Sequence, residues 1–307
     1  MATPTPAEPI LASNLYTLET ANQTPPPEVL PNQWQPPLKT SSLTNDFNFN
    51  FTSNSLNYIT TPSRPETQDL LQTLLTTHLL SSKTSTATVI DSTLDFDVRK
   101  LHNTLKAQIK TSLQLPTSSH HHHSEEDTTL QHLSRVKISK IFDLKGLIET
   151  ISEVQAEDSH KHDFLLLIIT NLTNNLLLSP SYVQTQATFT SLMRLLDHLC
   201  KTRNLCVVVF GDGRRANKKK VEEEEERLSM FESCGMSEVL GGGCGVGGLV
   251  DGHLYLHKVL RRRRKRETGG GDGHALVLEV VQDRYGDGYG QWVALEYDSE
   301  GRLKGIS

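Results

Sequence analysis

The sequence predicts an α/β fold with a mostly parallel sheet, helices on both faces and antiparallel strands at the C-terminal edge. Strand-like and helix-like segments alternate through residue 210, the order that builds a parallel sheet covered by helices. The apolar run Phe164–Ile169 is typical of a strand buried on both faces. Strand candidates separated by turn residues finish the chain, which indicates antiparallel pairing at one edge.

Each element rests on a local pattern. The predicted strands are short runs of β-branched or apolar residues, and they cover residues 56–60, 86–91, 136–142, 164–170, 205–210, 253–259, 275–281 and 292–297. The predicted helices repeat apolar residues at spacings of three and four, and they cover residues 66–80, 96–109, 144–154 and 180–200. Gly286-Asp287-Gly288 indicates a hairpin between the last two strands.

Glycine and proline are distributed unevenly along the chain. All 20 glycines lie at or after Gly146, and most of the 13 prolines lie at or before Pro65. Residues 1–54 are rich in Pro, Thr, Asn and Ser and are expected to form a disordered tail, followed by one domain at residues 55–307. Low-complexity inserts are expected near residues 116–128, 211–227 and 261–273.

Composition excludes several classes of protein. The net charge of −5 argues against a uniformly basic nucleic-acid coat. No run approaches the roughly 18 apolar residues of a membrane span, and the polar N-terminus is unlike a secretory signal. Four cysteines, none in a C-x-x-C pair, predict neither a metal site nor a disulfide framework, and they favour a reducing compartment.

Four segments together resemble the core of the RecA-fold recombinases, especially the eukaryotic strand-exchange recombinases and their paralogues. Residues 88–101 resemble the family's second strand and the start of the next helix, and residues 136–144 resemble the following strand. Residues 164–171 take the place of the Walker B strand. Residues 202–209 resemble the strand before the second DNA-binding loop. The resemblance covers roughly residues 56–300 and implies a RecA-like domain.

The resemblance aligns the family's phosphate-binding loop with residues that are unsuited to binding phosphate. The family pattern G-x-x-x-x-G-K-[ST] aligns with residues 60–67, where Thr60 and Pro65 replace the two glycines. Glu66 replaces the lysine, and only Thr67 fits the pattern. Glycines let backbone N–H groups approach phosphates, proline has no N–H, and a carboxylate repels a triphosphate. No other G-x-x-x-x-G-K-[ST] exists in the chain.

The two acidic positions of the family's catalytic site are also changed. The Walker B aspartate aligns with Thr170, and the glutamate that activates water aligns with Thr93. A neutral hydroxyl cannot serve as that general base near neutral pH. We therefore expect a pseudo-ATPase with no catalytic residues and no cofactor. An active ATPase with an unorthodox loop is the less favoured alternative.

Two basic segments are candidates for nucleic-acid contact. The first lies where the resemblance places the second DNA-binding loop, and it contains Arg214, Arg215, Lys218, Lys219 and Lys220. Residues 222–226, all glutamate, nearly cancel its charge, so a solvated charged insert is the alternative. The second is a nuclear import signal or a nucleic-acid patch, with a solvated hairpin tip as the alternative. It consists of Arg261, Arg262, Arg263, Arg264, Lys265 and Arg266.

Two further patterns carry less weight. Gly243, Gly245 and Gly248 spell G-x-G-x-x-G, but a strand rather than a helix is predicted after them, so a dinucleotide site is not expected. Residues 120–123 are four histidines in a low-complexity segment, which we expect to be unstructured rather than metal-binding.

These observations together favour a non-catalytic RecA-fold protein that assists recombinational DNA repair in the nucleus. The resemblance implies a scaffold or mediator in a hetero-oligomer with other RecA-fold subunits, with possible contact to single-stranded DNA. The alternative is a RecA-fold structural subunit of a transfer-RNA-modifying complex, since such subunits also lack Walker motifs.

Overall fold

The structure is a computed structural model that describes most of the chain after residue 50. The described residues are 33–34, 49, 51–113, 122–156, 165–172, 182–215, 236–238, 246–260, 274–297 and 303–305. All of them belong to one compact unit, Gln33–Ser307. Most of the expected tail at residues 1–54 lies outside this description. Lys218, Lys219, Lys220 and the basic run Arg261–Arg266 also lie outside it.

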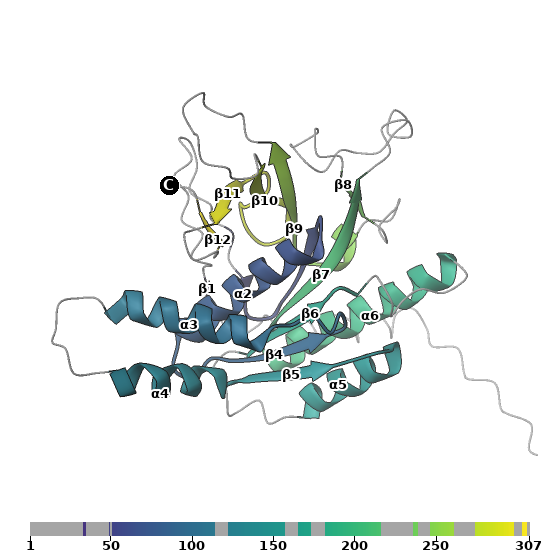
Figure 1. The fold of residues 1–307 in the computed structure, drawn as a ribbon. Coiled ribbons are helices and arrows are strands. Elements are labelled where there is room, and N and C mark those ends of the chain that lie inside the picture. Colours follow the sequence, from purple (N-terminus) through teal and green to yellow (C-terminus); the bar gives the residue numbers. More distant parts are fainter. Residues whose placement is uncertain are drawn as a thin grey trace, which may run out of the picture. The chain divides into compact units, whose positions relative to one another are not determined.

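Within the described residues, a 10-stranded sheet forms the centre of the unit (Figure 1). Its parallel strands are β3 (Ser55–Thr61), β4 (Thr86–Asp91), β5 (Val136–Lys140), β6 (Leu165–Thr170), β7 (Leu205–Arg215) and β9 (Gly252–Leu260). The antiparallel strands are β8 (Met236–Glu238), β10 (His274–Asp283), β11 (Trp292–Tyr297) and β12 (Leu303–Gly305). The main order is β12-β11-β10-β9-β3-β7-β6-β4-β5, and β8 pairs with β7. This topology confirms the predicted fold class, including the antiparallel C-terminal edge.

Helices cover both faces of the sheet. One face carries α2 (Arg64–Ser81), α3 (Val98–Leu113) and α4 (His122–Leu133). The other face carries α5 (Leu144–Ala156), α6 (Tyr182–Arg203) and the short 3₁₀ helix η3 (Val246–Leu249). Because helices cover both faces, the central strands bury both sets of alternating side chains, which explains their continuous apolar runs. None of the described helices is long and apolar enough to cross a membrane.

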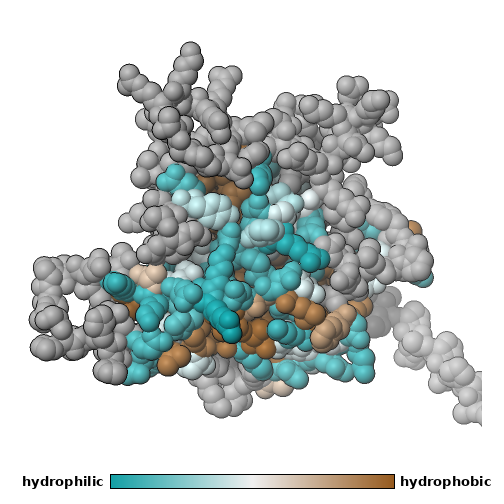
Figure 2. Space-filling model, in the orientation of Figure 1, coloured by the Kyte–Doolittle hydropathy of each residue, from teal (hydrophilic) through white to brown (hydrophobic). Residues whose placement is uncertain are grey.

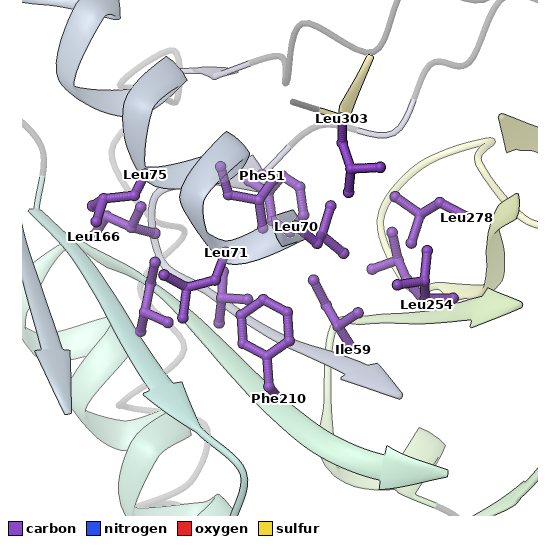
Figure 3. Packing of buried hydrophobic residues seen from close by; sticks show 14 of the residues in the cluster. Phe51, Ile59, Leu70, Leu71, Leu75, Leu166, Phe210, Leu254, Leu278 and Leu303 are labelled. Carbon is purple, nitrogen blue, oxygen red and sulfur yellow. The ribbon is translucent and has the colours of Figure 1, made fainter. Parts of the chain in front are cut away.

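The first core lies between α2 and the sheet. Figure 3 shows Leu70 and Leu71 of α2 beside Ile59 of β3 and Phe210 of β7. Leucines from the antiparallel strands and from β9, including Leu254, complete this cluster. Each of the named side chains is fully buried, and burial of one such side chain contributes roughly 1.5–3 kcal/mol. Helix α2 is therefore packed against both the parallel and the antiparallel parts of the sheet.

The second core lies on the opposite face, under α5 and α6. Tyr58 of β3 packs against Phe189 of α6, with ring centroids 6.2 Å apart in an edge-to-face arrangement. The close approach of Tyr58 also requires glycine at position 211, since a Cβ atom there would lie 1.8 Å from the Tyr58 hydroxyl oxygen.

Figure 2 shows hydrophilic residues over much of the described face in this view, with hydrophobic residues gathered mainly in its lower part.

Three features differ from the elements expected from the sequence. Phe49 and Phe51 lie within the expected tail, yet both are buried in the first core, and β2 (Phe51–Thr52) pairs with β1 (Gln33–Trp34). Helix α4 begins at His122, inside the segment expected to be an unstructured insert. Strand β7 continues to Arg215, into the expected charged insert, because β8 pairs with its last residues.

Candidate functional site

A small hollow lies where the parallel strands β3, β4, β6 and β7 end. In open α/β sheets, ligands bind at the carboxyl ends of the strands. The hollow is lined by Thr61, Arg64, Thr67, Gln68, Thr93, Thr170, Asn171, Phe210, Gly211 and Asp212. Its interior has room for about one water molecule. Three of the six predicted nucleotide-site positions, Thr67, Thr93 and Thr170, therefore lie together, and Thr60, Pro65 and Glu66 do not line the hollow.

The connection between β3 and α2 is very short. Strand β3 ends at Thr61 and α2 begins at Arg64, so only Pro62 and Ser63 join them. A phosphate loop of the family pattern needs a longer stretch of free backbone between strand and helix to surround the phosphates. Most of the residues aligned with that loop therefore belong to the regular elements on either side.

Two threonine hydroxyls that line the hollow, those of Thr61 and Thr67, link the end of β3 to the first turn of α2. The Oγ1 atoms of Thr61 and Thr67 are 2.5 Å apart. The Thr67 hydroxyl also lies 2.8 Å from the carbonyl oxygen of Ser63, and the Thr67 backbone N–H donates to that same carbonyl. Thr67, the one residue that fits the family pattern, is thus hydrogen-bonded to the end of β3 and to the residue that caps its own helix, α2.

Glu66 faces a lysine from a distant strand. Only 7% of Glu66 is exposed, and its Oε1 lies 3.2 Å from Nζ of Lys258 in β9. Glu66 also lies in the first turn of α2, where a negative side chain stabilises the positive end of the helix dipole. A helix N-terminus of this kind commonly binds phosphate, but here the carboxylate of Glu66 supplies the negative charge. Pro65 removes one backbone N–H from the same turn.

Thr60 points to the other face of the sheet. Its Oγ1 lies 3.0 Å from Nε2 of His253 in β9, and both residues are buried. Burial lowers the pKa of His253 to about 3, so this imidazole is neutral at physiological pH. Further along the same face, His257 pairs with Glu279 of β10 at 2.7 Å. Thr60 therefore belongs to a buried polar cluster beside the antiparallel strands.

Thr93 and Thr170 are joined through one buried carboxylate, that of Asp91 at the end of β4. The Asp91 Oδ1 accepts hydrogen bonds from the hydroxyls of Thr93 at 2.8 Å and Thr170 at 3.1 Å. It also accepts backbone N–H bonds from Thr93 and Leu94, and the Oδ2 accepts one from Phe96. The carboxylate of Asp91 thus has five donors. Thr170 ties the end of β6 to the end of β4, and Thr93 closes the turn that follows β4.

The sequence patterns do not single out Asp91 or Lys258. Asp91 is the last residue of a strand and is followed by Ser92 and Thr93. An aspartate at such a place commonly accepts hydrogen bonds from the backbone N–H groups that follow it, and this local pattern could have indicated its role. Lys258 is separated from Glu66 by 192 residues, so no local pattern connects them. Asn171, which has a positive φ of 37°, donates from Nδ2 to Asp212 at 2.8 Å on the opposite rim of the hollow.

The structure places the other candidate residues as follows. The backbones of Arg214 and Arg215 lie in β7 and pair with β8. Gly248 lies in η3, and strand β9 follows it, while Gly243 and Gly245 are outside the described residues. The part of the chain that the structure describes contains no group of three or more His, Cys, Asp or Glu residues able to hold a metal. Cys200 and Cys206 are free and buried, and burial raises the pKa of the Cys206 thiol to about 12.

Comparison with known proteins gives a clear result for structure and none for sequence. No protein-family model matches the sequence, and no curated protein is significantly similar to it. Among solved structures, the RadB recombinase matches with a TM-score of 0.53 and 14% identity, over 84% of this chain and 93% of that chain. A second solved structure, an ATPase domain, matches with a TM-score of 0.52 and 10% identity, over 83% of this chain and 86% of that chain. At such identities the likeness establishes a shared fold, and that fold is RecA-like.

Proposed function

We propose that this protein is a non-catalytic RecA-fold scaffold or mediator of recombinational DNA repair. In this proposal it acts in the nucleus within a hetero-oligomer whose other RecA-fold subunits handle ATP. Its basic segments contact single-stranded DNA. The RecA-like fold and its likeness to a recombinase structure support the general class. The local geometry of the candidate nucleotide site supports the non-catalytic part.

The observation that carries the proposal is the start of α2. Two residues join β3 to α2, and the helix end is neutralised by Glu66, which is paired with Lys258. A triphosphate placed there would meet a carboxylate instead of a lysine and would have no loop of N–H groups around it. The interior of the hollow beside it has room for about one water molecule.

The remaining polar groups of the site support the same conclusion. Asp91 has five hydrogen-bond donors from its own chain, so it is already fully engaged. Thr93 and Thr170 donate to that carboxylate, and neither hydroxyl is a general base. Thr170 joins neighbouring strands and Thr93 braces the turn after β4, which supports a scaffold whose shape does not depend on nucleotide.

The proposal is tested by complementation of cells that lack the protein. Survival after double-strand breaks is measured with the wild type, with Thr67→Ala/Thr93→Ala, and with serine in place of Arg261–Arg266. We expect the wild type and the threonine variant to restore survival, because the proposal assigns no ATP chemistry to these threonines. We expect the serine variant to fail. Equal amounts of each variant in the cells serve as the control.

Two outcomes would overturn the proposal. Failure of the threonine variant, with normal thermal stability of the purified protein, would indicate that the site works on nucleotide. Normal survival of the cells without the protein, together with loss of a modified nucleoside from their transfer RNA, would favour the transfer-RNA-modifying complex instead. Mass spectrometry of digested transfer RNA gives that second readout.

A further inference from the structure

The turn between β10 and β11 displays two tyrosines at the surface. Tyr285 is 72% exposed and Tyr289 is 65% exposed, and the residues between them are Gly286, Asp287 and Gly288. The turn lies at the amino-terminal end of β9, since Asp283 pairs with Gly252, and so at the opposite end of the sheet from the hollow. It is therefore separate from the candidate nucleotide site.

The backbone of this turn is held firmly in place. The carboxylate of Asp283 accepts N–H bonds from Tyr285, Gly286 and Gly288, at 2.9 to 3.3 Å. The N–H of Arg284 donates to the carbonyl of Asp251 at 2.8 Å. Exposed aromatic rings on a preorganised turn lose little conformational entropy on binding, and tyrosine is enriched at the energetic centres of protein interfaces.

The charge around the turn is negative. Among the described residues, four carboxylates lie in this region, those of Asp197, Asp251, Asp283 and Asp287, of which Asp251 is buried. The two described cations of the region are already engaged, since Lys201 lies 2.7 Å from Asp197 and Arg284 lies 3.9 Å from Asp251. Asp287 is exposed, and its carboxylate takes part in none of the ion pairs found among the described residues. A negative surface repels nucleic-acid phosphates and attracts a basic peptide.

The chain itself places a cation on one of these two rings. The guanidinium of Arg284 lies over the ring of Tyr285, 5.8 Å from its centroid. A planar guanidinium can stack on an aromatic face and bind a carboxylate in the same pose, which a lysine ammonium does less well. Tyr289 and Asp287 are both exposed and lie two residues apart in the same turn, so an aromatic ring and a carboxylate are available there to a second guanidinium.

We propose that the Tyr285–Tyr289 turn is a docking surface for an arginine-rich segment of a partner protein. An arginine side chain of the partner stacks on the exposed ring of Tyr289 and pairs with Asp287, beside the Tyr285 ring that Arg284 already covers. The inference does not depend on the proposed function, because it uses neither the hollow nor the basic segments of this chain.

The test uses the full chain and a short fluorescein-labelled peptide of alternating arginine and glycine, with binding measured by fluorescence anisotropy. We expect saturable binding that weakens as salt increases, and weaker binding of the same peptide with lysine in place of arginine. Tyr289→Ala and Asp287→Asn are each expected to weaken binding of the arginine peptide about threefold or more.

Matched controls come from α5 and the loop before it. Phe142→Ala removes another exposed aromatic ring, and Glu153→Gln removes another exposed carboxylate, so both should leave binding unchanged. All four substitutions are at exposed side chains, and unchanged melting temperatures show that each variant is folded. Equal losses in the control variants, or equal affinity for the arginine and lysine peptides, would overturn the proposal. Binding of a thymidine oligonucleotide that Tyr289→Ala abolishes would also overturn it and would identify a base-stacking surface.

Discussion

Glu66 is the residue that most sets the chemistry of the candidate nucleotide site. A carboxylate in place of the family's lysine is a reversal of charge, and an unpaired charge at a buried position would be strongly destabilising. Lys258 of β9 compensates this charge, since its Nζ lies 3.2 Å from Oε1 of Glu66, while Oε2 of Glu66 has no hydrogen-bond partner among the described residues. Glu66 therefore ties the first turn of α2 to the strand where the antiparallel part of the sheet begins.

This role predicts the effect of a charge reversal at position 66. Glu66→Lys places two ammonium groups together and is expected to lower the free energy of unfolding by about 1–2 kcal/mol, since the Lys258 side chain is partly exposed. The double variant Glu66→Lys/Lys258→Glu should recover part of the loss. Urea unfolding measures both. Arg64→Gln is the matched control, because its ion pair with Asp95 is exposed and should contribute less than about 0.5 kcal/mol. An unchanged stability of Glu66→Lys would contradict the pairing.

Asp91 is the second residue whose loss has a defined consequence. Asp91→Asn replaces one acceptor oxygen by an N–H₂ group, which is itself a donor. In one orientation of the amide this group faces the N–H of Phe96, and in the other it faces the four donors that now bind Oδ1. The free energy of unfolding should fall by about 1–3 kcal/mol, the usual effect of leaving a buried polar group unsatisfied. Asp95→Asn, an exposed aspartate in the same loop, should have little effect in the same urea titration. Equal effects of the two substitutions would show that the buried network contributes nothing.

At the scale of elements, the sequence predicted the regular structure better than the connections. Long apolar or periodic runs identified the central strands and most helices, because burial imposes those periods directly. The sequence does not predict helix α4, because a histidine-rich, acidic segment has little apolar periodicity of its own. Its contact with α3 is tertiary and leaves no local pattern in the sequence. The short β3–α2 connection was also missed, because alignment to the family pattern fixed the residues but not where the strand ends and the helix begins.

Two elements carry buried histidines that make stability depend on pH. Burial lowers the pKa of His78 in α2 to about 4 and that of His253 in β9 to about 3, from ordinary values of 6.5. Both are neutral in the folded protein, while the unfolded chain binds protons below pH 6.5. The free energy of unfolding is therefore highest above that pH and falls as the pH decreases towards 4. The slope is up to about 1.4 kcal/mol per pH unit for each histidine.

Urea unfolding at about pH 7.5 and at about pH 5 measures this dependence. His78→Gln keeps a donor for the Thr86 carbonyl, removes one titrating group, and should reduce the difference between the two conditions. A wild-type stability that is equal at both pH values would contradict the assignment of neutral, buried histidines.

At the scale of the whole molecule, the fold was accessible from the sequence and the site only in part. Alternation of strands and helices, together with four weakly matching segments, led to the RecA-like fold that the solved structures share. Thr67, Thr93 and Thr170 do lie together, because the carboxyl ends of parallel strands meet at one edge of the sheet. The partners of Thr60 and Glu66 come from β9, almost 200 residues further along the chain, so tertiary pairing alone determines them.

The whole chain also carries a prediction about location. If Arg261–Arg266 is an import signal, serine at all six positions should move a fluorescent fusion from the nucleus to the cytoplasm. Serine at Lys218, Lys219 and Lys220 removes charge from the other basic segment and should leave the fusion in the nucleus. Fluorescence microscopy gives the ratio of nuclear to cytoplasmic signal for each. Nuclear accumulation of the six-serine variant would remove the import role of this run.

The central claim is that this RecA-like chain does not bind ATP, and calorimetric titration with ATP and magnesium tests it most directly. Both the wild type and Glu66→Lys are titrated, because one reversion restores the lysine but neither the loop nor the acidic groups. We predict no heat of binding for either protein at micromolar concentrations. Magnesium-dependent binding of ATP by the wild type in the micromolar range would contradict the alignment at residues 60–67 and the non-catalytic function built on it.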